Sequence, residues 1–303
     1  MAPNDNGSAP RDLGVSDQAP HAGSMSIPRR DVEFGFDPHA VPRDWCSADA
    51  FETTFLNALS LLFPEGERFF VESVKQQKAK VTDAELAKAV VGFIGQEAMH
   101  GKEHRAFNEL LVAHGFPEAP HIEAGLRVFL KRVRKVLAPM SQLAVTCALE
   151  HFTAMLAEGL LSDERMQAEM DPRVRPLWLW HALEESEHKA VAFDVYRAAG
   201  GTYARRAAIM LLTTAVFFAA TALVHARLMR TRKIFWKPWR WVAGATRLWI
   251  YPGYFTRLAP AYFSYFRPGF HPGDRDTRAL LETWRETLFG AAGTLVERTR
   301  VVA

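Results

Sequence analysis

The chain contains two copies of the spacing Glu-x-x-His, and each copy follows a lone glutamate by a few dozen residues. The copies are Glu97 with His100 and Glu185 with His188, and the lone glutamates are Glu67 and Glu150. A glutamate and a histidine three residues apart share one face of a helix, so both can address one ion. The order Glu, Glu-x-x-His, Glu, Glu-x-x-His is typical of a dinuclear metal site inside a four-helix bundle.

Apolar residues place these side chains on the inward faces of helices. In the second predicted helix, steps of three and four residues connect Leu86, Val90, Phe93, Glu97, His100, His104, Phe107 and Leu111. A buried network of Glu, His and Arg is the alternative interpretation, but burying four carboxylates without a cation is very costly. We therefore predict these metal ligands: Glu67, Glu97, His100, Glu150, Glu185 and His188.

The helix pattern predicts an all-α, ferritin-like four-helix bundle with a long crossover and extra C-terminal helices. We expect Ser47 to cap a first helix that bends or restarts at Pro64, and Thr82 or Asp83 to cap a second helix running to about His114. The fourth helix is predicted over residues 172–199 and a last amphipathic helix over 276–298.

The crossover follows from a length argument. In one continuous helix over residues 121–150, Glu150 would lie about 43 Å from the preceding turn, against about 26 Å for Glu97. The two side chains would then not meet, so the chain should break near Pro139 and residues 115–138 should form the crossover.

Composition divides the chain into three parts. Residues 1–35 are rich in Pro, Gly, Ser and Asp and predict a disordered leader. Residues 36–203 hold the bundle, and residues 204–303 form a hydrophobic and basic helical extension that packs on the bundle or on a membrane.

Several residues beside the predicted ligands also bear on the site. His104 and His181 fall at the same end of the site if their helices are antiparallel. We predict that they support a ligand, transfer a proton or act as an extra ligand. The alternative is that both are ordinary core histidines. Glu65 competes with Glu67 for the same role. We expect His151 and Glu184 to point away from the site and Glu187 to lie on the surface.

Residues 207–224 contain no charged residue and have basic residues and tryptophans nearby. Their length suits one membrane span, and association with the membrane surface is favoured over a fifth helix packed on the bundle. The two isolated cysteines and the net charge of +3 predict no disulfide framework and no nucleic-acid partner. We predict a cytoplasmic protein, with the inner face of the membrane as a second location.

Several stretches resemble the predicted metal-dependent hydrolase family of bacteria, a ferritin-like group. They are FPEGERFF, FIGQEAMHGKEHRAFNELL, CALEHFTA, WLWHALEESEHKAVAFDVY and YFRPGFHPGD, spread from about residue 40 to 275. The resemblance implies metal-binding roles for the six predicted ligands. It also implies hydrolysis, although the sequence lacks the HExxH and Gly-x-Ser-x-Gly motifs of common hydrolases.

The ligand types favour a different reaction. Four carboxylates and two imidazoles suit two metal ions, with iron expected and manganese or zinc as alternatives. We predict oxygen-dependent oxidation of a small apolar or lipid-like substrate. The alternatives are hydrolysis by a water-activating dinuclear site and a metal-binding bundle without catalysis. For the oligomeric state of the chain, we consider a homodimer.

Overall fold

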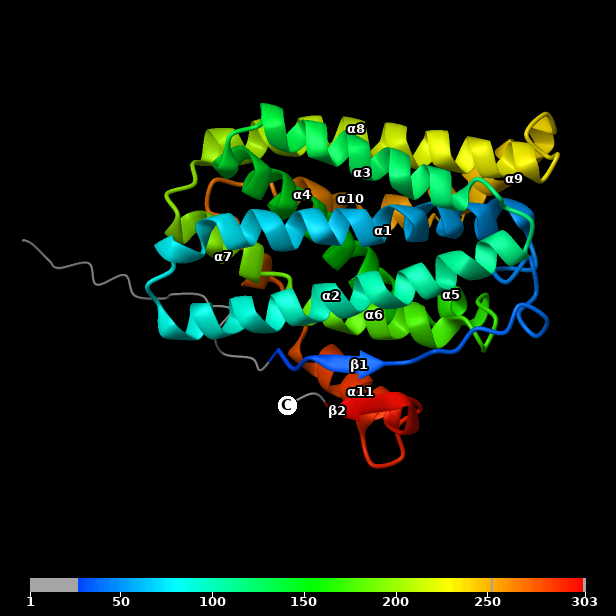
Figure 1. Cartoon of the computed structure of the whole chain (residues 1–303), viewed down its shortest axis with the longest axis horizontal. Coiled ribbons are helices and arrows are strands. Elements are labelled where there is room, and N and C mark those ends of the chain that lie inside the picture. The colour runs from blue at the N-terminus through cyan, green and yellow to red at the C-terminus, as the bar shows by residue number, and fades with distance from the viewer. Residues whose placement is uncertain (1–26, 252, 302–303) are drawn as a thin grey trace, which may run out of the picture.

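The computed structural model describes residues 27–251 and 253–301, and it confirms the all-α prediction (Figure 1). The likeness to ferritins stays a prediction. The helices are α1 (Ala50–Gln77), α2 (Ala84–Ala113), α3 (Ala119–Val136), α4 (Pro139–Ser162), α5 (Glu164–Ala168), α6 (Arg175–His188), α7 (Val191–Ala198), α8 (Tyr203–Thr231), α9 (Pro238–Trp249), α10 (Tyr254–Ser264) and α11 (Arg278–Phe289). Short 3-10 helices occupy Lys78–Lys80, Pro272–Asp274 and Val296–Arg298, and the strands are β1 (Arg30–Val32) and β2 (Thr299–Val301).

The residue that caps helix α1 lies two positions later than the predicted cap. Its cap is Asp49, whose carboxylate accepts a hydrogen bond from the Phe51 amide at 2.8 Å. The predicted cap Ser47 instead has a φ of 54°, in a turn before the helix. Pro64 lies inside α1 and does not end it, because one missing amide donor is tolerated in a helix held on several sides by other helices.

The predicted crossover is present. Asp83 caps α2, as one of the two predictions had it, and Gly115 ends the α2 turn with a φ of 84°. Helix α3 then runs along α1 and ends before Pro139, where α4 begins. The break that the length argument required therefore falls where it was predicted.

The predicted fourth helix is wrong as a single element. It consists of α6 and α7, which are separated at Lys189 and Ala190. The buried Lys189 ammonium donates hydrogen bonds to Glu158 at 2.8 Å and to Thr277 at 3.1 Å. Those partners lie on α4 and just before α11, so the break is associated with contacts that the local sequence does not contain.

Both ends of the described chain cover α6. Residues 1–26 of the predicted leader lie outside the described residues. Within the leader's predicted bounds, β1 pairs antiparallel with β2, and the division of the chain at residue 35 stays a prediction. The predicted last helix is also shorter, since α11 ends at Phe289. Figure 1 shows β1, β2 and α11 together on one side of the bundle, and α11 packs on α6.

Among the described residues, two helices are long and apolar enough to cross a membrane, α4 and α8. The most apolar stretch of α4 is 72% buried, as expected for a core helix, whereas the most apolar stretch of α8 is only 17% buried. Helix α8 packs on α4 and α1 along one face. Its other face exposes large apolar side chains: Leu211, Leu212, Val216, Phe218 and Leu223.

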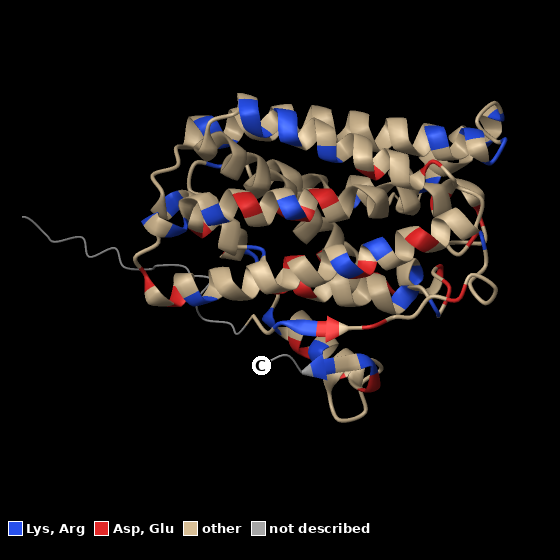
Figure 2. Ribbon diagram, viewed as in Figure 1, with Lys and Arg blue, Asp and Glu red and all other residues tan. Residues whose placement is uncertain are grey.

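Part of the basic flank after α8 is used inside the protein. Arg232 pairs with Asp44 at 2.6 Å, and Arg247 pairs with Glu52 at 2.7 Å. These pairs attach the α8–α9 end to the start of α1. Figure 2 shows further basic residues at this end of the molecule. The division of the chain at residue 204 stays a prediction, although α8 and α10 both contact the bundle helix α4.

The bundle core is divided along its length. One apolar cluster includes Phe107, Leu177 and Trp180, and a second includes Phe93 and Leu143. Glu97 and His100 lie between Phe93 and Phe107 on α2, so the middle of the bundle is a polar layer with apolar packing at both ends. The layer is inaccessible to bulk water because its side chains are buried.

Candidate metal centre

Seven buried side chains on four helices converge in the polar layer. They are Glu67 on α1, Glu97 and His100 on α2, Glu150 on α4, and His181, Glu185 and His188 on α6. The structure thus brings the six sequence-predicted ligands together, while their metal-binding role stays a prediction. The seventh, His181, was predicted to support a ligand or move a proton, with direct ligation as an alternative.

The seven side chains form two groups. Glu67, His100 and His181 make one group, and Glu97, Glu150, Glu185 and His188 make the other. Within each group, one potential ligand atom from every residue lies within 4.8 Å of the others. Two such groups side by side are the arrangement expected for a pair of ions.

Glu185 lies between the two groups. Its Oε1 is 2.9 Å from His181 Nε2 and 3.5 Å from His100 Nδ1. Its Oε2 is 3.5 Å from His188 Nε2. The two oxygens of this carboxylate therefore face different groups, which makes Glu185 the residue best positioned to bridge two ions.

The potential ligand atoms lack the hydrogen bonds that buried polar atoms normally make. Within the described residues, no hydrogen bond reaches either carboxylate oxygen of Glu67, Glu97 or Glu150. The same holds for Glu185 Oε2, His100 Nδ1 and His188 Nε2. Each unsatisfied buried group costs about 1–3 kcal/mol, and a charged one more. Since these atoms all face one small volume, the residues fit bound cations.

The electrostatics of the cluster agree with that fit. Burial and neighbouring carboxylates raise the pKa values of Glu67, Glu97 and Glu150 above their usual range. Burial opposes ionisation of Glu185 too, but His188 and the other imidazoles hold its pKa well below normal. Cations would replace the protons that otherwise compensate this charge, so metal binding should release protons.

A chain of hydrogen bonds fixes the tautomer of His181. Ser60 donates its only hydroxyl proton to Asn108 Oδ1 at 2.7 Å, so it must accept from His104 Nδ1 at 2.9 Å. His104 Nε2 then accepts from His181 Nδ1 at 2.7 Å. Burial lowers the pKa of His104 well below normal and that of His181 to about 4, so both rings are neutral. His181 Nε2 consequently carries a lone pair, and it faces Glu185 Oε1 at 2.9 Å and Glu67 Oε1 at 3.7 Å.

The same chain continues to the edge of the bundle. Asn108 Nδ2 donates to Glu123 Oε1 on the crossover helix α3 at 2.6 Å. Burial raises the pKa of Glu123, whose side chain is only partly covered. The antiparallel placement of His104 and His181 at one end of the site, predicted from the sequence, is present.

The other two imidazoles are oriented by side chains outside the cluster. His100 Nε2 contacts Glu184 Oε2 at 3.0 Å, and His188 Nδ1 contacts Gln96 Oε1 at 2.9 Å. Because Gln96 Oε1 can only accept, His188 Nδ1 carries the proton and Nε2 faces the cluster. Hydrogen bonds of this kind orient ligand histidines and raise their basicity. Burial opposes protonation of His100, but the nearby carboxylates of Glu184 and Glu185 raise its pKa to about 10.

Two expectations about acidic residues were wrong. Glu184 does not point away from the site, and Glu187 is buried rather than on the surface. Arg30 of β1 contacts Glu184 at 2.9 Å and Glu187 at 2.8 Å, and Arg285 of α11 contacts Glu187 at 2.6 Å. The spacing rules treated the outer face of α6 as exposed, whereas the ends of the chain cover it.

The remaining neighbours lie away from the cluster. Glu65, the competitor of Glu67, contacts Arg127 and Arg68 at 2.9 Å each. His151 points away as expected and contacts the carbonyl oxygen of Ala261 at 3.0 Å. Sequence reasoning missed Arg30, Gln96, Ser60, Asn108 and Arg285 entirely.

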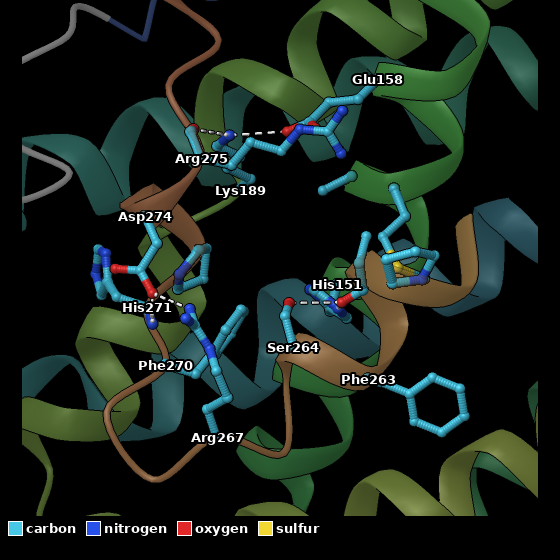
Figure 3. A pocket seen from close by; sticks show the side chains of 15 residues that line it. His151, Glu158, Lys189, Phe263, Ser264, Arg267, Phe270, His271, Asp274 and Arg275 are labelled. Carbon is cyan, nitrogen blue, oxygen red and sulfur yellow. Dashed lines mark hydrogen bonds and ion pairs between the residues drawn. The ribbon is translucent and has the colours of Figure 1, made fainter. Parts of the chain in front are cut away.

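A separate cavity of 590 Å³ opens near the α6–α7 break (Figure 3). The charged side chains on its wall pair with one another, namely Lys189 and Arg275 with Glu158, and Arg267 with Asp274. None of the seven clustered residues lines this cavity within the described part of the chain. We therefore assign the candidate centre to the bundle interior.

The fold and the cluster define an all-α bundle protein with a buried carboxylate and histidine site suited to metal ions. Comparison with known families matches residues 28–276 to the family described as Predicted metal-dependent hydrolase, and the chain belongs to that family. Searches of curated proteins and of solved structures found no match. The family and the clustered ligands support metal ions as the cofactor.

Proposed function

We propose that this chain is an enzyme with a dinuclear metal centre held by seven ligands. The observation that carries the proposal is the convergence of unbonded carboxylate oxygens and imidazole nitrogens in a buried layer. The clustered carboxylates and imidazoles would hold divalent ions, and such ions would polarise a substrate oxygen and lower the pKa of a bound water. The sulfur-free ligand set suits iron, manganese or zinc.

Hydrolysis is the first reaction that we assign to this centre. The family description supports it over the oxidation that the ligand types alone had favoured. In this reaction the protein residues hold the substrate beside Glu185 and His181. The hydrogen-bond chain from His181 through His104, Ser60 and Asn108 to Glu123 would hold the His181 ring in place at the centre.

Oxygen activation is the second candidate, and one observation favours it. An apolar cavity of 70 Å³ is lined by His181, Glu185 and Phe63, so the centre faces a water-poor space. Such a space suits oxidation of an apolar substrate better than hydrolysis of a polar one.

One experiment separates these candidates. The protein is purified anaerobically, depleted with a chelator and reloaded with zinc, manganese or ferrous iron. Turnover of p-nitrophenyl esters that requires metal and not oxygen supports hydrolysis. Oxygen consumption by the ferrous protein, without ester turnover, supports oxidation. Metal binding with neither activity across a broad substrate panel would favour a non-catalytic bundle.

A further inference from the structure

Two apolar cavities lie in line between α8 and the candidate centre. The outer cavity, of 480 Å³, is enclosed by α1, α4, α8, α9 and α10, and its walls include Phe152, Phe217 and Tyr262. The inner cavity, of 70 Å³, reaches His181 and Glu185. The outer volume falls in the range of about 300–1,000 Å³ that small-molecule sites occupy.

The two cavities share part of their walls. Phe55 and Leu59 of α1 and Leu156 of α4 line both of them. These side chains are therefore the partition between the cavities. Phe55 and Leu156 are only partly buried although they lie on inward-facing positions, because they face open space on both sides. A narrow apolar route thus leads from the α8 side to Glu185.

We propose that the joined cavities bind one long, unbranched acyl chain with its oxygen-bearing end at the metal centre. The assignment rests on the proposed function and adds the class of substrate. The walls are almost entirely aliphatic and aromatic, so a polar substrate would lose its hydrogen bonds to water without replacement. A straight chain is the apolar shape that fits two chambers joined by a constriction.

Both cavities have a buried polar atom without a hydrogen bond within the described residues, Thr221 Oγ1 in the outer one and Trp178 Nε1 in the inner one, and the orientation rests on the inner group because His181 and Glu185 lie beside it. The indole of Trp178 lines the inner cavity, and its buried Nε1 makes no hydrogen bond within the described residues. An indole N–H can only donate. A carbonyl or carboxylate oxygen of the acyl group would satisfy it beside His181, which places the hydrocarbon tail in the outer cavity.

The binding test uses the full chain loaded with Mn²⁺ and palmitate labelled uniformly with ¹³C. We expect the paramagnetic ion to broaden the carboxyl carbon most and the methyl carbon least. We also expect palmitate to bind at least about tenfold tighter than octanoate, because eight more methylenes are buried. Equal broadening along the chain, or equal affinity for the two acids, would overturn the proposal.

Variants locate the bound chain. Leu156→Trp blocks the passage between the two cavities and should weaken palmitate binding at least tenfold, measured by displacement of the fluorescent acid cis-parinarate. Leu156→Met keeps the side-chain volume and should leave palmitate binding unchanged. Ala259→Phe narrows the outer cavity and serves if Leu156→Trp does not fold. Trp178→Phe should reduce the difference in broadening between the two ends. Wild-type affinity in both filled variants contradicts the proposal.

Metal content distinguishes failure of the acyl-chain proposal from failure of the proposed metal centre. Leu156→Trp should keep the wild-type Mn²⁺ content, since Leu156 is not a ligand. If the wild type binds no Mn²⁺, the proposed centre fails, yet chain-length dependence still tests the cavities. Faster palmitate uptake from phosphatidylglycerol vesicles than from solution identifies a bilayer source, and slower uptake a free acyl compound; both support acyl binding.

Discussion

Single residues decide whether this bundle interior is a metal centre or only an unusual core. Glu65 and Glu67 illustrate the distinction, because both are buried glutamates on α1 two positions apart. Glu65 contacts arginines, whereas both oxygens of Glu67 lack hydrogen bonds within the described residues and face the cluster. At the scale of the residue, a carboxylate that pairs with arginines is therefore distinguished from one whose two oxygens face other acids and imidazoles, as a metal ligand would.

Replacing Glu150 tests that distinction. Glu150→Ala removes two unsatisfied oxygens from one group, so metal content should fall from about two ions per chain to one or fewer. The bundle should stay helical because its apolar clusters are intact. Elemental analysis with circular dichroism measures both. Glu65→Gln is the matched control and should keep the wild-type metal content; equal loss in both variants would exclude Glu150 from the ligand set.

Arg30 should act on the centre through other residues. Arg30→Met breaks its contacts to Glu184 and Glu187, which orient His100 and, through Gln96, His188. Loss of such support typically costs about 10–100-fold in metal affinity. Competition with a chromophoric chelator measures the change. Arg300→Met, at an exposed position on β2, should leave the affinity unaltered, and an unchanged affinity in Arg30→Met would reduce Arg30 to a structural role.

The elements differ in how far their sequence predicted them. Helix α2 was predictable because its apolar and ligand residues follow one regular stripe, and the crossover followed from helix length. The break between α6 and α7 was not, because it coincides with Lys189 binding partners on α4 and near α11. Glu184 and Glu187 were misjudged for a similar reason, since β1 and α11 cover them only after the chain ends come together.

Helix α8 offers a pH test of how the elements are joined. His225 on α8 donates a hydrogen bond to the Phe51 carbonyl oxygen of α1 at 3.1 Å, and burial lowers its pKa to about 4. The unfolded chain takes up a proton near pH 6.5, whereas the folded chain resists until about pH 4. This contribution to stability is therefore complete above pH 6.5 and is lost as the pH falls towards 4.

His225→Gln removes that titration and keeps an N–H donor. Between pH 7 and pH 5, the free energy of unfolding should decrease in both proteins. The decrease should be smaller in the variant than in the wild type, by roughly 1–2 kcal/mol. Urea denaturation at both pH values provides the measurement. His121→Gln, at an exposed position on α3, should behave like the wild type. The account of α8 is wrong if both variants share the wild-type pH dependence.

At the scale of the whole molecule, an uncovered apolar face adjoins the buried site. The exposed residues of α8 lie on the same helix that encloses the outer cavity. We predict that this face contacts a membrane surface. Leu211→Glu with Leu212→Glu should reduce sedimentation with phosphatidylglycerol vesicles severalfold, because buried apolar area drives such binding. Val91→Glu, at an exposed apolar position on α2, is the control; vesicle binding equal to wild type in the α8 variant would contradict the prediction.

The central claim is that side chains from four helices hold two ions in the bundle interior. The most direct measurement is an anaerobic titration of the chelator-treated protein with Mn²⁺, followed by electron paramagnetic resonance. The account predicts about two bound ions per chain, with the exchange coupling of ions bridged by a carboxylate such as Glu185. Two isolated, uncoupled ions, or no tight binding while the bundle remains folded, would contradict it.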